Sequence, residues 1–415
     1  MAQPISYHAQ SSVSNPKSFP FHRSVRATWE EKWKFLAHKG LYPFSDGNGQ
    51  DFDRVFEKLI EDSGDDPAVF FDPDKYAKPF FPVGEDLVNE AKKAEEAGDR
   101  DRARDLFLRA GAVYRIARFP IIRSPLGQKA WELGKEAYLH ASPYLASPIH
   151  EVSIPHTHAS LEAGESDSAQ IGAFLRFPEG NKPDNGWPLV LFISGLDAYR
   201  TDHSSGPAGK LYSHLQHGQA VLIVDIPGTA DSPAARNDPE SPDRLWSSVL
   251  DWVEEHKGHY NIDTSRIAAR GISTGGYYAM RIAHTHADRL VAVVAQGGGS
   301  HHMFDLEWIQ AQNHMEYPFA LADALAYKFG YGDVESYANS NPRARFSLLE
   351  TGILNRQSAR LFLVNGMEDS IFPIEDSLLP LQYGRVKDAR FVPGRGHMGA
   401  PESEFIIRDW LLSIL

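Results

Sequence analysis

The amino-acid sequence predicts an α/β protein in which a mostly parallel sheet of eight strands follows a helical region. Three patterns lead to this prediction. Up to about residue 148 apolar residues recur with the period of helices, whereas beyond it short apolar strands alternate with helical segments. Such nearly continuous apolar strands are typical of parallel sheets covered on both faces. Residues 300–356 then interrupt the alternation with helical, aromatic-rich sequence.

The helical region is expected to form an N-terminal domain, residues 1–148. Its clearest helix carries apolar residues at helical spacing from Ala103 to Ala117, and a turn at Gly98-Asp99 precedes it. The resulting hairpin resembles a single tetratricopeptide unit, but no second copy follows at a fixed period. Another helix is predicted over 124–141. The proline-rich sequence ASPYLASPIH then marks a boundary near residue 148.

The second predicted domain, residues 149–415, contains the sheet. Extended segments are expected at about 150–155 and 170–177, and in PLVLFISG, AVLIVDIPG, RIAARGIS, LVAVVAQGGG, RLFLVNG and ARFVPG. Helices with one apolar face lie among and after them, so right-handed crossovers should connect parallel strands. The segment 300–356 begins just beyond a strand end, and we therefore expect it to form a lid over a pocket.

Charge and composition exclude several classes of partner. The net charge is −13 and Lys or Arg residues form no clustered run, which argues against nucleic acid and anionic membrane surfaces. The chain has no cysteine, so it has no disulfide, thiolate nucleophile or cysteine-ligated metal. Its first residues show no secretory signal and no apolar run has bilayer length, so a cytoplasmic protein is expected.

No cofactor is expected from the motifs. A GxxxxGK[ST] phosphate loop is absent, and no GxGxxG follows a predicted strand. His156 and His158 could share one face of a strand, but no third ligand lies at a recognisable spacing. We therefore expect neither a nucleotide nor a metal site.

A lone serine stands where a predicted strand meets a predicted helix. Gly271-Ile272-Ser273-Thr274-Gly275 matches G-x-S-x-G, the pattern in which a serine nucleophile is held on a sharp strand-to-helix turn. An ordinary helix N-cap serine would also fit this position. The choice between the two depends on whether a base and a carboxylate follow.

Both partners follow at the ends of the next strands. A serine hydroxyl needs a base, and the base needs an orienting carboxylate. Asp369 lies just beyond RLFLVNG, with Glu368 and Asp376 as rivals, and His397 lies in a glycine-rich loop after ARFVPG. The order serine, acid, histidine is that of the α/β-hydrolase fold. We therefore predict that Ser273, Asp369 and His397 form a catalytic triad.

An oxyanion hole requires two backbone N–H groups aimed at the developing charge. Thr274 follows the serine and is the first candidate. Leu196 lies in the loop after LVLFISG and is the second. His301-His302 follows a glycine triplet at a strand end, where it could line the pocket or have a satisfied structural role.

Six motifs, spread over residues 114 to 399, carry a resemblance to a known family: YRIARFP, ISGLDAYRTD, VDIPGTADSP, GISTGGYYAMRIA, NGMEDSIFP and GRGHMG. Together they resemble the α/β-hydrolases that shorten fungal polyketides, typified by the yellowish-green pigment hydrolase of naphthopyrone and melanin pathways. The bacterial hydrolases of 2,6-dihydroxypseudooxynicotine are similar. The resemblance implies C–C bond hydrolysis in a 1,3-dicarbonyl side chain, with the triad at the family's catalytic positions and the N-terminal helices closing the pocket.

The expected substrate is an aromatic polyketide, shortened in pigment or secondary-metabolite biosynthesis. The many aromatic side chains of 300–356 suit a flat apolar slot, although such residues also commonly pack a core. We expect Asp197, His302 and Trp308 to contact the substrate. The resemblance is also consistent with a homodimer.

Other functions remain open on the sequence alone. An esterase, a lactonase or a polyketide-releasing transacylase would use the same triad. A prolyl-oligopeptidase-type peptidase would need a propeller of short strands upstream, where helices are predicted instead. An inactive hydrolase-fold binding protein would have no need of an intact Ser, Asp and His set.

Overall fold

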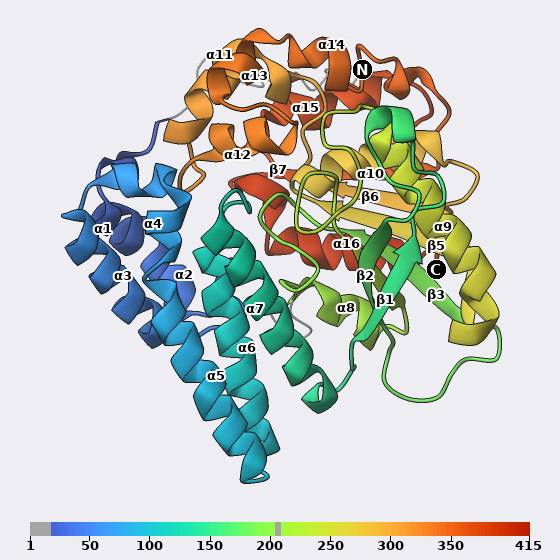
Figure 1. Cartoon of the computed structure of the whole chain (residues 1–415). Coiled ribbons are helices and arrows are strands. Elements are labelled where there is room, and N and C mark those ends of the chain that lie inside the picture. The colour runs from blue at the N-terminus through green and yellow to red at the C-terminus, as the bar shows by residue number, and fades with distance from the viewer. Residues whose placement is uncertain (1–17, 204–208) are drawn as a thin grey trace.

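The computed structural model describes residues 18–203 and 209–415. A single sheet of eight strands lies at the centre of the part of the described chain that follows the N-terminal helices (Figure 1). The prediction about a secretory signal concerns mainly residues 1–17, which lie outside the described residues. Within the described ranges, no helix combines the length and apolar character needed to cross a bilayer.

The strands follow one another along the chain at the predicted places. They are β1 (His150–Pro155), β2 (Gln170–Arg176), β3 (Trp187–Ile193), β4 (Ala220–Val224), β5 (Ile262–Ile272), β6 (Ala292–Gln296), β7 (Arg360–Gly366) and β8 (Asp388–Val392). Their order in the sheet is β1-β2-β4-β3-β5-β6-β7-β8. The strand β2 runs antiparallel to its neighbours β1 and β4. All other neighbouring pairs, from β4-β3 to β7-β8, are parallel. The predicted mostly parallel eight-stranded sheet is confirmed.

The first helices precede the sheet and pack on one another. They are α1 (Val25–Ala27), α2 (Lys34–His38), α3 (Gly49–Ser63), α4 (Pro73–Ala77), α5 (Phe80–Glu96), α6 (Arg100–Ala117) and α7 (Pro125–Ala141). The helices α5 and α6 form the hairpin that the sequence predicts, and α7 packs along α6 (Figure 1). Asp99 and Ser124 cap the starts of α6 and α7 through side-chain hydrogen bonds to backbone N–H groups.

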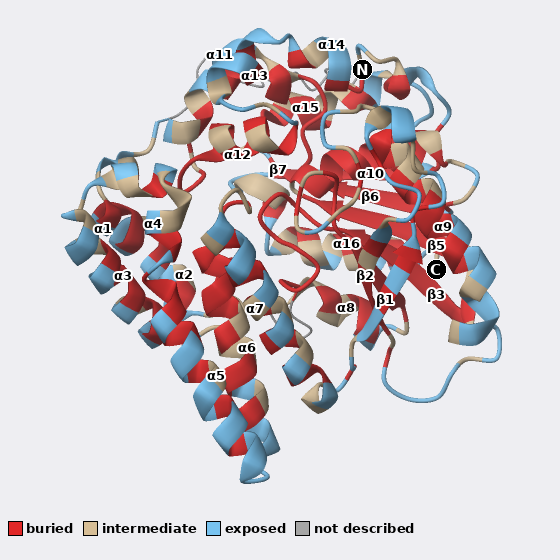
Figure 2. Ribbon diagram, viewed as in Figure 1, coloured by how far each residue is buried: buried red, intermediate tan, exposed pale blue. Residues whose placement is uncertain are grey.

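Helices cover both faces of the sheet. They are α8 (Lys210–Gln216), α9 (Ser241–Tyr260), α10 (Thr274–Thr285), α15 (Ile374–Leu378) and α16 (Glu402–Leu412). The helix α10 packs against β5 and β6, and its neighbour α9 packs against β5 and β1. The helix α16 packs against β7 and β8, with α8 as its neighbour. The inner strands are accordingly buried over most of their length, whereas the edge strands β1 and β8 are partly exposed (Figure 2).

Between β6 and β7 the chain leaves the sheet and forms four short helices. They are α11 (Leu306–Ala311), α12 (Leu321–Lys328), α13 (Val334–Asn339) and α14 (Pro342–Phe346). We call residues 300–356 the lid insertion. Figure 1 shows its helices, in orange, above the sheet and beside the N-terminal helices. Its residue Phe319 stacks on Phe70 with ring centroids 4.3 Å apart, so the two helical parts share a core.

Candidate active site

Ser273 lies at the corner between β5 and α10 in a backbone conformation that L-residues rarely adopt. Its φ is 52° and its ψ is −126°. The Ser273 N–H donates to the carbonyl of Gln296 at the end of β6 (2.8 Å), which fixes the corner to the neighbouring strand. Backbone strain of this kind is typical of functional positions. Serine nucleophiles held on a strand-to-helix turn are one such class of positions.

Two glycines of the motif are needed for this corner to pack. A Cβ on Gly275 would lie 2.3 Å from the carbonyl oxygen of Ser194, directly after β3. A Cβ on Gly271 would lie 2.1 Å from the carbonyl oxygen of Gly275. Backbone atoms would have to move to admit either side chain, so glycine at both positions lets α10 start directly against the sheet.

The hydroxyl of Ser273 is not used as a helix cap. Although Ser273 is the N-cap residue of α10, its side chain makes no capping hydrogen bond. Its Oγ instead lies 2.9 Å from Nε2 of His397, which follows β8. The other ring nitrogen, Nδ1, lies 2.9 Å from Oδ2 of Asp369, which follows β7. Because a carboxylate only accepts hydrogen bonds, Nδ1 carries the hydrogen and Nε2 accepts the Ser273 proton.

Asp369 is held in place by its own loop. Its Oδ2 also accepts from the side-chain amide of Asn365 (2.9 Å), and its Oδ1 accepts from the backbone N–H groups of Ile371 (2.8 Å) and Phe372 (3.2 Å). The ring of Phe372 meets the His397 ring edge-on, with centroids 5.7 Å apart. These contacts fix the carboxylate that orients the imidazole.

The two rival acids have other environments. Asp376 is buried, and its carboxylate accepts from the backbone N–H groups of residues 301–303 at 2.7–2.8 Å, where the lid insertion starts. Glu368 is exposed. The structure therefore brings Asp369, and neither rival, to His397.

His397 has a pKa above its ordinary value of 6.5. Burial alone favours the neutral ring and lowers the pKa, but the adjacent Asp369 carboxylate outweighs it by stabilising the imidazolium. Glu316 and Asp197 face the ring from the lid insertion and from the loop after β3, and each raises the pKa further. Negative charge around this histidine makes it a stronger base toward Ser273.

Both predicted oxyanion donors flank the serine. Thr274 is the first residue of α10, where a helix leaves N–H groups without intrahelical partners. Leu196 follows Gly195, and a Cβ on Gly195 would lie 3.5 Å from the Ser273 Cβ. The arrangement can therefore present two backbone donors beside the hydroxyl, with the positive end of the helix dipole behind one of them.

Asp197, one of the three predicted substrate contacts, lies next to this group. Its Oδ1 is 3.9 Å from the same Cβ position on Gly195, and its Oδ2 accepts a hydrogen bond from the Tyr317 hydroxyl (2.7 Å). Burial raises the pKa of the Asp197 carboxyl, and the Tyr317 hydrogen bond only partly offsets this. The ring of Tyr317 stacks on Phe119, just after α6, with centroids 5.5 Å apart.

The other two predicted contacts are held by the lid insertion itself. The His302 ring bonds to Asp305 (2.8 Å) and packs against His301. Trp308 is fully buried. Most aromatic side chains of the lid insertion likewise pack on one another, as Phe304 does on Phe329, so they form a core rather than a row above Ser273.

Three residues near the site were not predicted as site residues. Gln296 accepts the Ser273 N–H and donates its side-chain amide to the carbonyl of Met398 (3.2 Å), so it connects the serine and histidine loops. A polar residue closing the apolar strand LVAVVAQ was the available signal. Glu316 and Tyr317 come from the lid insertion, and nothing in their local sequence indicates contact with a distant loop.

The histidines considered as metal ligands have protein partners instead. His156 bonds to Ser248 (3.0 Å) and His158 to Asp251 (2.7 Å). Over residues 18–203 and 209–415, no three or more His, Asp or Glu side chains are grouped so as to hold a metal ion.

Comparison with solved structures places the fold among known hydrolases. The chain is similar to the crystal structure of the 2,6-dihydroxy-pseudo-oxynicotine hydrolase, with 20% sequence identity, a TM-score of 0.64, and 82% of this chain and 88% of that one covered. It is also similar to wild-type AbyA5, with 20% identity, a TM-score of 0.57, and 79% and 81% covered. At this identity the two likenesses show the α/β-hydrolase fold.

Curated relatives share part of the sequence. Esterase FrsA of Salmonella newport (strain SL254) is 28% identical over 292 residues, which is 69% of this chain and 64% of the relative. The protein of the same name from Salmonella enteritidis PT4 matches equally. The chain thus spans less than two thirds of the length of these relatives. The family model described as Esterase FrsA-like matches residues 85–394, from α5 to just past β8. The chain therefore belongs to the FrsA-like esterase family.

Proposed function

We propose that the protein is a serine-dependent hydrolase in which Ser273, His397 and Asp369 act as a catalytic triad. The observation that carries the proposal is the unbroken chain of two 2.9 Å hydrogen bonds, from the Ser273 hydroxyl through His397 to Asp369, on a strained strand-to-helix corner. A helix cap or a binding module needs no such chain.

In the proposed reaction, Nε2 of His397 takes the Ser273 proton as Oγ attacks a carbonyl carbon. The N–H groups of Thr274 and Leu196 stabilise the resulting oxyanion, and each such donor contributes about 2.7–4 kcal/mol in the transition state. Collapse of the tetrahedral intermediate expels the leaving group, which gains the proton from His397. Water, activated by the same histidine, then hydrolyses the acyl-serine.

We further propose that the bond cleaved is a C–C bond in the 1,3-dicarbonyl side chain of an aromatic polyketide. The attacked ketone carbon stays on Ser273 and leaves as a carboxylic acid, while the other fragment departs as an enolate and gains a proton. The proton that His397 took from Ser273 goes to this enolate, at carbon or at oxygen, just as it would go to the alkoxide of an ester. The sequence motifs shared with polyketide-shortening hydrolases and the fold likeness to the 2,6-dihydroxy-pseudo-oxynicotine hydrolase support this proposal.

Ester or lactone hydrolysis is the second candidate. The family description and the printed name of the Salmonella relatives, esterase, favour it. The triad and the two backbone donors would serve it without change, because both reactions pass through a tetrahedral oxyanion. The two candidates differ only in the leaving group.

One assay separates the candidates. The purified protein is offered a naphthopyrone-type heptaketide and, separately, aryl esters and lactones, and the products are followed by mass. A shortened aromatic product and a small keto acid are expected from the heptaketide. Rapid ester or lactone turnover without shortening of any diketone would remove the C–C proposal and leave the triad.

A second assay tests the triad itself. A fluorophosphonate probe should label the wild-type protein and the variant Ser265→Ala, in which an exposed serine of β5 is removed. Ser273→Ala should show no labelling and a turnover lower by at least about 10³. Labelling that survives Ser273→Ala would contradict the assignment of the nucleophile.

A further inference from the structure

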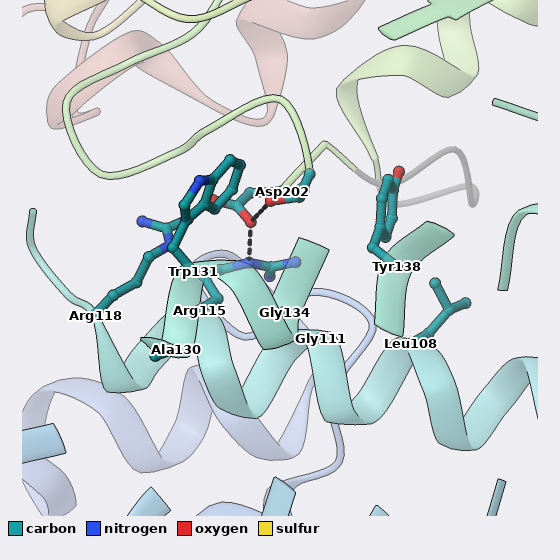
Figure 3. A pocket seen from close by; sticks show the side chains of 10 residues that line it. Leu108, Gly111, Arg115, Arg118, Ala130, Trp131, Gly134, Tyr138 and Asp202 are labelled. Atoms are coloured by element: carbon teal, nitrogen blue, oxygen red, sulfur yellow. Dashed lines mark hydrogen bonds and ion pairs between the residues drawn. The ribbon is translucent and has the colours of Figure 1, made fainter. Parts of the chain in front are cut away.

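Buried charges gather where the N-terminal helices meet the loop after β3. A cavity of about 10 Å³ lies there between α6, α7 and the loop (Figure 3). Its walls include Arg115 of α6, Arg118 at the C-terminal cap of α6, Trp131 of α7 and Asp202 of the loop. The space holds about one water molecule, so it is no substrate pocket. Side chains of its walls nevertheless bind the loop segment next to Leu196.

Two arginines, one in α6 and one at its C-terminal cap, bind this loop. Nη1 of Arg118 donates to the carbonyl oxygen of Asp197 (3.1 Å), and Nη2 of the same side chain pairs with Asp202. Nε of Arg115 lies 3.1 Å from the other carboxylate oxygen of Asp202. All three charged side chains are at most 3% exposed. Removing one partner of such a buried ion pair strongly destabilises the structure, because the other charge stays buried without a partner.

The loop is also closed on itself through the same carboxylate. Asp202 accepts from the Tyr199 N–H (2.7 Å) and from the Thr201 hydroxyl (2.7 Å). The Arg118 guanidinium lies over the Tyr199 ring, 3.6 Å from its centroid, as cation–π contacts require. The Arg118 guanidinium therefore anchors residues 196–203 at the end of α6 with three kinds of contact, and Arg115 adds an ion pair to the same carboxylate.

We propose that Arg118, supported by Arg115 and Asp202, is a positioning residue for the oxyanion hole. It holds the loop so that the Leu196 N–H points to the space beside Ser273. This inference rests on the proposed function, because it assumes that Ser273 forms an oxyanion. The sheet holds only the two ends of this segment. β3 ends at Ile193, and the next N–H, that of Ser194, still donates to the carbonyl of Val224 in β4 (3.1 Å). Further along the loop Arg200 bonds to Asp225, directly after β4, so Arg118 restrains the stretch between these two points.

Holding the loop after β3 in place matters for stabilisation of the oxyanion. An oxyanion donor acts only when it is aimed at the position of the charge in the transition state, and a displacement of about 1 Å can lower the rate about 10²-fold. Ground-state binding of substrate does not depend on the same bond. Loss of the anchor should therefore lower kcat more than it raises KM.

The test replaces Arg118 by lysine, which keeps the charge but cannot reach both Asp197 and Asp202. We expect kcat for an aryl ester to fall about 10- to 100-fold with KM within about twofold. The affinity for an aryl trifluoromethyl ketone, whose serine adduct carries the same oxyanion, should fall in parallel. Fluorophosphonate labelling should slow as well.

The matched control lies on the same helix. Arg109 forms a two-pronged ion pair with Asp51 (2.9 Å for both bonds) within the N-terminal helices. Arg109→Lys should lower the melting temperature but leave kcat and trifluoromethyl ketone affinity unchanged. If Arg118→Lys lowers stability in the same way and leaves both catalytic measures unchanged, the inference is overturned.

A milder variant covers the case in which Arg118→Lys does not fold. Thr201→Val removes the hydroxyl that bonds to Asp202, and it should reduce kcat and inhibitor affinity by the same, smaller factor. An unchanged kcat in a folded Thr201→Val protein would then overturn the proposal. Failure of the wild-type protein to be labelled at Ser273 would instead remove the proposed function on which the inference rests.

Discussion

The strained conformation of Ser273 has a measurable consequence for stability. Residues held in sparsely populated regions of φ/ψ cost about 1–3 kcal/mol each, and glycine escapes most of that cost. Ser273→Ala and Ser273→Gly both remove the hydroxyl and its bond to His397, so the difference between them isolates the backbone. Glycine also makes the unfolded chain more flexible, which costs about 0.5–1 kcal/mol.

The net expectation is that Ser273→Gly is more stable than Ser273→Ala by about 0.5–2 kcal/mol. At an unfolding entropy of about 2.1 cal/mol/K per residue, a chain of 415 residues gains roughly 1 °C in melting temperature per kcal/mol. Calorimetry of the two variants side by side resolves such a difference. Both variants should be inactive.

A control serine should give the opposite sign. Ser247 lies within α9, where the backbone is helical, and its hydroxyl bonds to His286 (3.0 Å). There the glycine variant should be less stable than the alanine variant by about 1 kcal/mol, because glycine is a poor helix former. If Ser273 behaves as Ser247 does, with glycine the less stable replacement, the corner is not strained and the reasoning fails.

Three further predictions follow from the site. Asp369→Asn should lower turnover by about 10³–10⁴. Asp376→Asn should mainly lower the melting temperature, because the Asp376 carboxylate accepts from backbone N–H groups of the lid insertion. A larger loss of activity in Asp376→Asn than in Asp369→Asn would show that the wrong acid was chosen. Glu316→Gln should move the acidic limb of the pH profile of kcat/KM to lower pH and leave its plateau unchanged. The reason is that the Glu316 carboxylate raises the pKa of His397, whose neutral form is the active one, so that its loss lowers this pKa. An acidic limb that stays in place would contradict this coupling. A fragment without residues 1–148 should be aggregated or inactive in gel filtration and esterase assays, and a soluble, fully active fragment would refute the view that the N-terminal helices cover the site.

The sheet could be predicted because its signals are local. The strand β5 and the start of α10 are adjacent in the sequence, with apolar residues up to Ile272 and glycines at 271 and 275. A GxSxG motif between a strand and a helix needs no knowledge of distant contacts. Ser273, Asp369 and His397 could be proposed together for the same reason, since each follows directly on a recognisable strand.

The rest of the site depends on contacts between segments far apart in the chain. Tyr317 reaches Asp197 only because the lid insertion folds back onto the loop after β3, and Arg118 reaches that loop from a helix some 80 positions earlier. Hydrophobic periodicity shows which face of α6 is buried but not what lies against it. The aromatic lid residues illustrate the same limit: their number suggested a substrate slot, but rings such as Phe329 and Phe346 pack on each other.

The charges around His397 connect the N-terminal helices to the chemistry by a second route. Lys32, from the N-terminal helices, lies 3.7 Å from Glu316, and Glu316 accepts a hydrogen bond from Ser370 (2.8 Å), the neighbour of Asp369. The same carboxylate raises the pKa of His397. A substitution at Lys32 would remove a positive charge that faces Glu316, and so change the field at the base without touching the triad. The N-terminal helices thus bind the loop after β3 through Arg118, and through Lys32 they act on a carboxylate that raises the pKa of His397. For that reason we expect them to act as part of the catalytic unit rather than as a separable cover.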